Sequence, residues 1–225
     1  MAIFVSSGCD PRSCLSAADD CAAGEAEHFT FIAESEDDYV IGIEGIDPVA
    51  SNRVLLLAVH PVCGDGIEEH GEGCDDNNTL NGDGCDAWCR TELLEASADE
   101  VEPNDDSYGA NVLLAVTPGD SRTLRGQIGG CRADFFKLSV MADSYASFVM
   151  NMDETNCASP SLQLELWNAD ADALRTAGLL QSAGRSESGA CPAFYLSDLP
   201  AGDYFIRISS DETNYVAYEL QLDTL

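Results

Sequence analysis

Short runs of alternating hydrophobic and polar residues, rich in β-branched and aromatic side chains, dominate the hydrophobic pattern of this chain. Such runs, separated by Gly, Pro, Asp and Asn, predict β-strands joined by turns. We expect strands at residues 28–33, 39–43, 53–59, 134–140, 161–167, 204–208 and 218–222. Helical periodicity is scarce, and residues 169–180, its best candidate, suit a long loop equally well. The pattern therefore predicts an all-β protein built from antiparallel, jelly-roll-like β-sandwiches.

A weak internal repeat divides the chain. Asp38 and Asp203 each begin a strand of the form Asp-Tyr-apolar-Ile-x-Ile, with a Phe-x-apolar pair ten residues before each tyrosine. Residues 22–60 thus correspond to the second half of a domain that residues 101–225 form in full, the alternative being chance similarity of two amphipathic hairpins. The predicted domains are an incomplete, C-terminal half of a β-sandwich at 1–61, a small, irregular disulfide module at 62–93, a linker at 94–100 and a complete sandwich at 101–225. The missing half is expected to precede this sequence or to come from elsewhere.

The charge of the chain narrows its partners. It carries 41 acidic and 10 basic residues, a formal net charge of −31. Nucleic acid and anionic membranes would repel such a surface, whereas a divalent cation, a cationic partner or a high-salt environment fits it. A solvated acidic surface explains most of these carboxylates without any ligand. No stretch approaches the roughly 18 apolar residues that a membrane helix needs, so we expect no membrane insertion.

Ten cysteines, an even number, indicate disulfide bonds. Zinc binding is the alternative, but the chain has no Cys-x-x-Cys pair and its three histidines are isolated. Disulfides persist in oxidising compartments, so we expect an extracellular or cell-surface protein. The first residues lack the charge and length of a secretory signal, and the signal is therefore expected outside this sequence.

Four of the cysteines, Cys63, Cys74, Cys85 and Cys89, lie in a very polar segment. Residues 61–110 hold fifteen acidic residues and one basic residue, and the only large apolar side chains near these cysteines are Ile67, Leu80 and Trp88. Burial alone cannot fold such a segment, so two disulfides among the four cysteines are expected to hold it. Three pairings are possible, and the sequence does not choose among them.

Oxygen-bearing side chains crowd around these cysteines and suggest calcium. Folding the carboxylates together without a counter-ion is costly, and a calcium ion with six to eight oxygen ligands removes that cost. The candidate ligands are Asp65, Asp75, Asp76, Asn78, Asp83 and Asp86, with Asn77 and Asn81 as further neutral oxygens. The spacing is not that of an EF-hand, because Leu80 stands where glycine is needed. A flexible acidic linker is the alternative, but it does not explain the cysteines.

Residues 63–92 resemble the myxobacterial-type cysteine-rich repeat. The segment contains Cys-Gly-Asp-Gly, then Gly-Glu-x-Cys-Asp-Asp, then Gly-Asp-Gly-Cys and a last cysteine. It departs from the repeat at Asn77, where the family has glycine, and at Asp86, where serine is usual. Asparagine is the best substitute for a glycine with positive φ. The resemblance implies secretion and architecture rather than an activity.

A second group of oxygens lies at the start of the last domain. Glu100, Glu102 and Asn104 occupy alternate positions, and Pro103 favours an extended backbone at the residue before it. Alternate residues of an extended segment share one face. We therefore expect these three side chains to converge on one cation.

Residues 100–225 resemble the bacterial pre-peptidase C-terminal domain. The matching motifs, in the family's order, are Glu-Pro-Asn-Asp at 102–105, Asp-Phe-Phe at 134–136 and Gly-x-Tyr-x-Ile-x-Ile at 202–208. The resemblance implies a β-sandwich that holds calcium through Glu100, Glu102, Asn104, Asp105 and Asp134. Some members have a further aspartate where this chain has Cys131, which implies weaker or water-mediated binding. Cys157 and Cys191 are candidates for a disulfide within this sandwich, which leaves Cys131 over.

No catalytic residues are predicted, because the chain lacks Gly-x-Ser-x-Gly, His-Glu-x-x-His and phosphate-loop motifs. We expect a non-catalytic, calcium-binding structural or adhesive module of a larger secreted, surface or filament-forming protein. Its expected partners are other domains or copies of the same or a larger protein, with strand complementation as one route. The alternative is an accessory C-terminal domain of a secreted hydrolase, such as a protease, that binds substrate or assists export. Carbohydrate binding through Trp88 or Trp167 is weaker, since a core position explains both.

Overall fold

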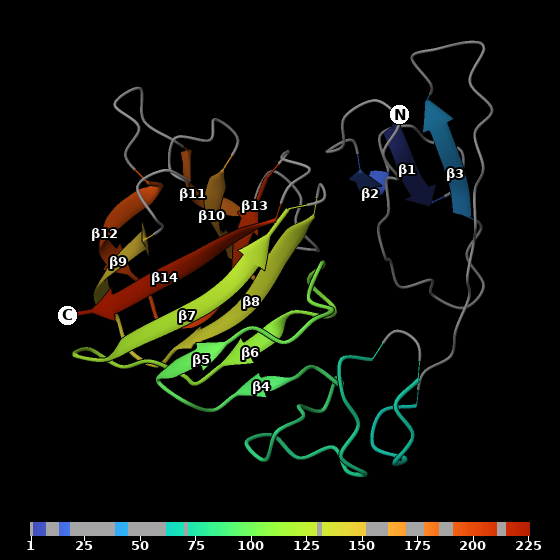
Figure 1. The fold of residues 1–225 in the computed structure, drawn as a ribbon, viewed down its shortest axis with the longest axis horizontal. Coiled ribbons are helices and arrows are strands. Elements are labelled where there is room, and N and C mark those ends of the chain that lie inside the picture. Colours follow the sequence, from blue (N-terminus) through green and yellow to red (C-terminus); the bar gives the residue numbers. More distant parts are fainter. Residues whose placement is uncertain are drawn as a thin grey trace. The chain divides into compact units, whose positions relative to one another are not determined.

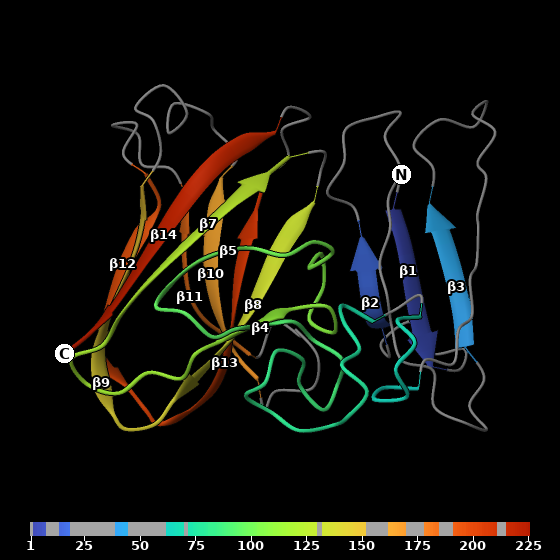
Figure 2. The ribbon, with the colours of Figure 1, turned by 60° about the horizontal axis from the view of Figure 1, so that its bottom comes forward.

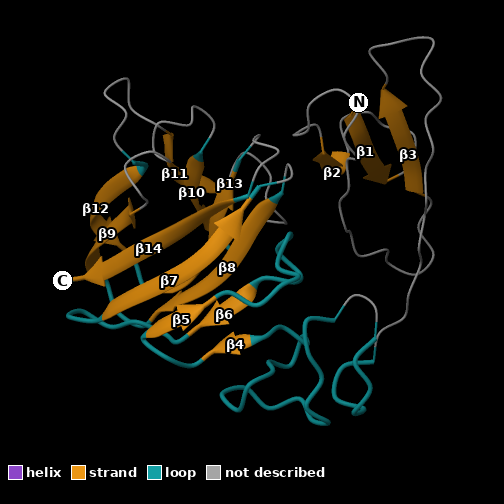
Figure 3. Ribbon diagram, in the orientation of Figure 1, coloured by secondary structure: helices purple, strands orange, loops and turns teal. Residues whose placement is uncertain are grey.

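The computed structural model describes residues 2–7, 14–18, 39–44, 62–69, 72–129, 132–151, 162–169, 178–184, 191–210 and 215–225. The chain divides into two compact units, residues 1–60 and 61–225. All regular elements in the described ranges are strands (Figure 3), which confirms the all-β prediction. In the same ranges there is no helix long and apolar enough to cross a membrane.

The first unit contains a small antiparallel sheet with the strand order β2-β1-β3. Its strands are β1 (Ala2–Ser7), β2 (Cys14–Ala18) and β3 (Tyr39–Glu44). The predicted strand at 39–43 is β3, whereas β1 was not predicted. The predicted strands at 28–33 and 53–59 lie outside the described residues, and with them lies most of the internal repeat.

Eight strands of the second unit form a jelly roll. They are β7 (Ser121–Ile128), β8 (Ala133–Val140), β9 (Ser144–Asn151), β10 (Gln163–Asn168), β11 (Leu179–Gly184), β12 (Ala193–Leu199), β13 (Gly202–Ser209) and β14 (Val216–Thr224). The antiparallel pairs are nested, β7 with β14, β8 with β13, β9 with β12 and β10 with β11. Such a folded double hairpin distributes its strands over two facing sheets (Figure 2). The prediction of a jelly-roll-like sandwich is confirmed.

Three short strands extend the two sheets through parallel pairs, so the sheets are mixed rather than purely antiparallel. They are β4 (Glu92–Leu93), β5 (Ser97–Asp99) and β6 (Asn111–Leu113). Strand β5 pairs with β7, β6 with β8, and β4 with β6, along one side of the sandwich (Figure 1). The predicted linker at 94–100 is therefore wrong, because β5 lies within it and belongs to a sheet.

The core lies between the two sheets and follows the period of two that a pleated strand imposes. In β13 and β14 buried residues alternate with more exposed ones along the strand. Phe136, Phe148, Leu164, Ile206 and other large side chains are fully buried there. One polar side chain, Asp134, also faces this core, at the end where β8 begins; this end is called the entrance of the sandwich below. Asp134 precedes Phe136 by two residues and therefore lies on the same face of the strand.

In its described residues, the cysteine-rich module has no hydrophobic cluster of its own. Ile67, Leu80 and Trp88 are exposed, Trp88 by 74%, which corrects the expectation of a core position for Trp88. Its two disulfides are nested, Cys63 with Cys89 and Cys74 with Cys85. The prediction of two disulfides among these four cysteines is confirmed. Trp167, in contrast, is buried.

Candidate metal centre

Strand β5 places the carboxylate of Glu100 at the end of the five-stranded sheet. The parallel pairing with β7 continues one residue beyond β5, where the Glu100 amide donates to the Arg125 carbonyl oxygen at 2.8 Å. The side chain then turns toward the sheet. Its Oε1 accepts the Gln127 amide at 2.6 Å, and its Oε2 accepts the Tyr218 hydroxyl at 2.7 Å. Two hydrogen bonds thus fix this carboxylate, and a third holds the backbone of Glu100.

Gly126 makes room for this carboxylate. It faces Tyr218 across the β7–β14 pair. A methyl group on Gly126 would overlap both the Glu100 carboxylate and the Tyr218 hydroxyl. The absence of a side chain here is therefore a requirement of the site, not of backbone conformation.

Asn104 and Asp134 lie beside each other at the start of β8, completely buried. The Phe135 amide donates to the Asn104 carbonyl oxygen at 2.9 Å, which holds the two segments together. Asn104 is 0% exposed and Asp134 is 1% exposed. In the described part of the chain, neither polar atom of the Asn104 side chain has a hydrogen-bond partner, and neither does Oδ2 of Asp134. Buried polar atoms of this kind are rare and costly, which points to a ligand.

The electrostatics of this cluster oppose its ionisation when no cation is bound. Burial, followed by the charge of Glu100, raises the pKa of Asp134 to about 9. Desolvation, followed by the charges of Asp105 and Glu100, also raises the pKa of Glu102. Burial and the neighbouring carboxylates raise the pKa of the Tyr218 hydroxyl. Several acids share a space where each additional negative charge is unfavourable.

The calcium-free protein should lose stability as the pH rises. Asp134 keeps its proton in the folded state up to about pH 9, whereas it is already ionised in the unfolded chain. Its contribution is fully present below its ordinary pKa and is lost progressively as the pH rises toward 9. We expect the melting temperature in EGTA to fall between about pH 7 and pH 9, where ordinary carboxylates have finished titrating. The D134N variant should lack this slope, and an equal slope in D134N would exclude Asp134 as its cause.

The other two predicted ligands at this entrance lie at the edge of the cluster. Glu102 is more exposed than Asn104 and Asp134. Its Oε2 accepts a hydrogen bond from the backbone amide of Asn104, two residues ahead, at 3.1 Å. Asp105 forms an ion pair with Arg132 at 3.0 Å. The backbone does not continue as an extended strand, as Pro103 suggested, because residues 101–104 form no strand and the chain bends at Glu102. Tertiary contacts, not simple alternation, bring these side chains together.

Most predicted ligands in the cysteine-rich module bind backbone amides instead of one another. Asp75 accepts four of them, from Gly64, Asp65, Gly66 and Asn77, and these bonds lower its pKa. Asp65, Asp76 and Asn78 each accept the amide two residues ahead, and Asp83 accepts the side-chain amide of Asn78. These are turn-stabilising bonds. The φ of Asn77 is 66°, in agreement with its predicted replacement of a left-handed glycine.

Asp86 has a basic partner within the protein. Its Oδ2 lies 2.7 Å from a guanidinium nitrogen of Arg90, and its Oδ1 accepts the amides of Trp88 and Arg90. Both members of the ion pair are buried. The counter-charge that the sequence assigned to calcium is supplied at this position by Arg90, the single basic residue of the segment.

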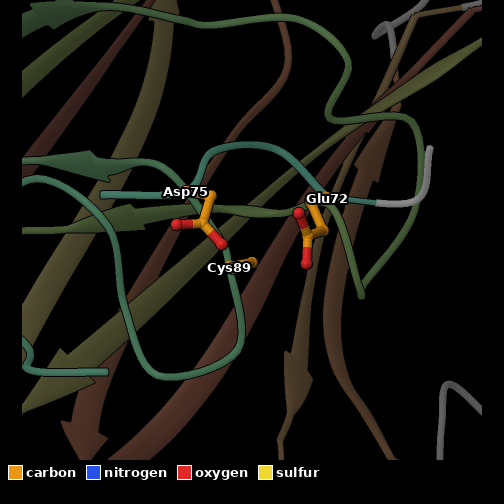
Figure 4. Close-up of side chains that lie close together, drawn as sticks. All are labelled: Glu72, Asp75 and Cys89. Atoms are coloured by element: carbon orange, nitrogen blue, oxygen red, sulfur yellow. The ribbon is translucent and has the colours of Figure 1, made fainter. Parts of the chain in front are cut away.

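Three side chains of the module lie close enough together to be considered as a metal site. Possible ligand atoms of Glu72, Asp75 and Cys89 lie within 4.8 Å of one another (Figure 4). However, Cys89 is joined to Cys63 in a disulfide, and Asp75 is saturated by amides. The remaining carboxylate, Glu72, accepts the Glu69 amide through Oε2 at 2.9 Å, and its buried Oε1, which has no partner in the described residues, is the one oxygen left for a cation. This group is therefore a poor cation site.

The entrance of the sandwich fits a hard cation better. It combines carboxylates with a neutral amide oxygen, which is the ligand set that calcium prefers, and two of its side chains have buried oxygens with no partner in the described residues. Sequence reasoning proposed Glu100, Glu102, Asn104 and Asp134 as ligands, which stays a prediction, and it did not include Gly126 or Tyr218. Only the tyrosine carried a signal, as a polar-tipped aromatic at a core position of β14.

Comparison with known proteins supports the prediction that the cysteine-rich segment is a separate module. Residues 58–90 match the family described as domain of unknown function DUF4215. The chain is also 52% identical over 63 residues to human Pappalysin-1, a match that covers 27% of this chain and 4% of that protein. The chain thus spans only a small part of that relative's length.

Solved structures resemble about half of the chain. One is the pre-peptidase C-terminal domain of a collagenase from Bacillus anthracis, 14% identical, with a TM-score of 0.37 over 48% of this chain and 92% of that one. Another is PliG from Aeromonas hydrophila, a periplasmic inhibitor of g-type lysozyme, 12% identical, with a TM-score of 0.37 over 49% and 97%. At this level of similarity, neither assigns a function to this chain.

Proposed function

We propose that residues 61–225 form a non-catalytic, calcium-stabilised module of a larger secreted or cell-surface protein, with a structural or adhesive role. The observation that carries this proposal is the pair of buried side chains Asn104 and Asp134. The Asn104 side chain and Oδ2 of Asp134 lack partners in the described residues, and the charge of Glu100 acts on Asp134. A calcium ion there would be held by Glu100, Glu102, Asn104 and Asp134. It would supply the positive charge that their shared burial requires.

The position of the site suggests what the ion does. Glu100 continues from β5 in the five-stranded sheet, and Asp134 belongs to β8 in the six-stranded sheet. A cation between them links the two layers of the sandwich. It also fixes residues 100–104, the segment through which the chain passes from β5 toward β6. Calcium would therefore make this end of the module rigid, as a load-bearing or adhesive module requires.

The disulfides support a location outside the cytosol. Two disulfides hold the cysteine-rich module, and Cys191 of the sandwich is also disulfide-bonded. Its predicted partner, Cys157, lies outside the described residues. Disulfides of this number suggest an extracellular or periplasmic compartment. Extracellular calcium, in the millimolar range, would keep even a weak site occupied.

Calorimetric titration of the whole chain with calcium tests the proposal. We expect binding that is lost in the double variant E102Q/D134N, because both substitutions remove a charged ligand. The matched control is E95Q/D198N, which removes two carboxylates at exposed positions away from the entrance. Calcium binding unaffected by E102Q/D134N would refute the assignment of the site.

A glycine substitution tests the same site without touching a ligand. In G126A the added methyl group should displace the Glu100 carboxylate from its bonds with Gln127 and Tyr218. Loss of one well-placed carboxylate should weaken calcium binding by about tenfold or more. The matched control is G184A, since a methyl group there meets nothing closer than 3.8 Å. Equal affinities in the two variants would contradict the role of Gly126.

An accessory domain of a secreted hydrolase is the second candidate. The order of the motifs at 102–105, 134–136 and 202–208, which resembles that of pre-peptidase C-terminal domains, favours it. The two candidates share the calcium site and differ in what lies beside it in the full protein. A hydrolase domain encoded next to this sequence, with activity that falls when residues 61–225 are removed, would establish the second and exclude the first.

A further inference from the structure

A turn of the cysteine-rich module holds a chemically reactive pair of residues, Asn81 and Gly82. This is the only Asn–Gly pair in the sequence. Both residues are exposed, and they precede the disulfide-bonded Cys85 by a few positions. Gly82 has a φ of 95°, in the left-handed region that favours glycine. The pair lies outside the proposed calcium site.

An Asn–Gly pair can deamidate without an enzyme or a cofactor. The backbone nitrogen of Gly82 loses its proton and bonds to Cγ of Asn81, and the Cγ–Nδ2 bond breaks with release of ammonia. Water then opens the resulting cyclic imide at either carbonyl, which gives aspartate or isoaspartate. Glycine favours the reaction because it has no side chain to hinder the approach of its nitrogen.

Glu92 holds the nitrogen that would attack. Its carboxylate accepts the Gly82 amide at 2.9 and 2.7 Å, and the amides of Asp83 and Gly84 at 3.1 Å each. Three successive amides around one carboxylate form an anion-binding nest. The proton that Gly82 must lose is therefore held in charge-assisted hydrogen bonds, and the negative charge of Glu92 opposes the formation of an amide anion beside it.

The carbon that would be attacked is held as well. Oδ1 of Asn81 accepts the Ala87 amide at 3.0 Å. The Asn81 carboxamide thus points toward Ala87, whereas the N–H of Gly82 points toward Glu92. Reaction requires that Gly82 leave Glu92, and release of Asn81 from Ala87 lets Cγ turn toward the nitrogen. The closed turn therefore keeps the two reacting atoms apart.

Both ends of this turn are anchored. Glu92 begins β4, which pairs with β6 in the six-stranded sheet, and its amide donates to the Gly84 carbonyl oxygen at 3.0 Å. Cys85 is joined to Cys74 and forms a β-bridge with Thr91. The turn is thus held between a disulfide and a strand of the sandwich, and it opens fully only when the module loosens.

We propose that Asn81–Gly82 is a deamidation site that Glu92 keeps unreactive while the module is folded. When the module opens, the pair reacts as it would in a free peptide. Isoaspartate lengthens the backbone by a methylene group, so the amides of residues 82–84 no longer match the Glu92 carboxylate. Opening of the module, for example by reduction of its disulfides, would thus leave a permanent chemical mark where the module joins the sandwich.

Peptide mapping by mass spectrometry tests the site. The whole chain and the peptide acetyl-Thr-Leu-Asn-Gly-Asp-Gly-amide are incubated side by side at mildly alkaline pH, and the gain in mass at Asn81 is followed. We expect the whole chain to react about tenfold or more slowly than the peptide, because only the open fraction of the turn reacts. The Asp–Gly pairs at 65–66 and 83–84 isomerise without a change in mass and do not interfere.

A charge-removing variant tests the role of Glu92. E92Q should deamidate at Asn81 about fivefold or more faster than the natural protein, because the amides lose a charged acceptor. The matched control is E95Q, which removes an exposed carboxylate three positions along the chain and should react at the natural rate. Amide exchange at 64–66, where the acceptor is Asp75, reports whether the rest of the module stays folded in E92Q.

The variant with Cys63, Cys74, Cys85 and Cys89 changed to serine should react at the rate of the peptide. No conversion in this variant would exclude the site itself, and a whole chain that reacts as fast as the peptide would overturn the protection. Equal rates in E92Q and E95Q, or acceleration in E92Q only with loss of protection at 64–66, would exclude the specific role of Glu92. None of these outcomes depends on calcium.

Discussion

Calcium at about 100 times its dissociation constant should raise the melting temperature of the sandwich by about 5–10 °C. This estimate combines the free energy gained from a ligand that binds only the folded state, about 2.7 kcal/mol at that excess, with the usual sensitivity of melting temperature in domains of this size. The side chain of Asn104 and Oδ2 of Asp134, buried without partners in the described residues, would gain a ligand only when the ion is bound. Calorimetry with calcium and with EGTA measures the difference.

The double variant E102Q/D134N provides the decisive comparison for this shift. Its melting temperature should not respond to calcium. In EGTA it should equal or exceed that of the natural protein near neutral pH, because a raised-pKa carboxyl has been replaced by a neutral amide. The control E95Q/D198N should keep the full response. A calcium shift of the same size in both double variants would place the stabilising ion elsewhere.

Removal of both disulfides of the cysteine-rich module should unfold that module and leave the sandwich folded. The bonds Cys63–Cys89 and Cys74–Cys85 close segments of 26 and 11 residues, and each is worth about 3 kcal/mol in a chain-entropy estimate. The module cannot replace this free energy, because Ile67, Leu80 and Trp88 are exposed. In the variant with these four cysteines changed to serine, amide hydrogen exchange should become fast at 62–91 and remain slow in β7–β14.

Substitution, rather than a reductant, keeps the disulfide of Cys191 intact in this experiment. A variant that lacks only Cys74–Cys85 serves as an intermediate control, since Cys63–Cys89 still joins the ends of the module. Loss of protection throughout the sandwich would show that the module is an integral part of the fold. Retained protection at 62–91 would show that the hydrogen bonds of Asp75 and the Asp86–Arg90 pair suffice to hold it.

Four of the eight long strands of the sandwich and the cysteine framework could be predicted from local sequence, whereas β7, β9, β11 and β12 were not predicted. Strands β8, β10, β13 and β14 each show the alternation that burial of one face imposes, and the prediction located all four. The short strands β4, β5 and β6 could not be found this way. Two or three residues cannot display a period of two, and parallel pairing with β7 or β8 depends on residues distant in sequence.

The sequence could name candidate ligands for this site, which stay a prediction, but it could not show their surroundings. The oxygens of Glu100, Glu102 and Asn104 stand close together in the sequence, and a family resemblance added Asp134. The roles of Gly126 and Tyr218 depend on their pairing across β7 and β14. The two residues are 92 positions apart in the sequence, so no local pattern reveals that they are neighbours. The same limit explains the cysteine-rich module, where backbone amides and Arg90 take up carboxylates that the sequence assigned to calcium.

The sequence by itself determined an all-β, disulfide-bonded, strongly acidic protein with oxygen-bearing side chains concentrated at two places. Those properties follow from periodicity, cysteine number and charge, which are local or additive. The tertiary structure alone decided the nested disulfide pairing, the hydrogen bonds of the Glu100 carboxylate with Gln127 and Tyr218, and the burial of Asn104 and Asp134. These depend on which strands become neighbours, and the packing of two layers settles that through contacts between residues far apart in the chain.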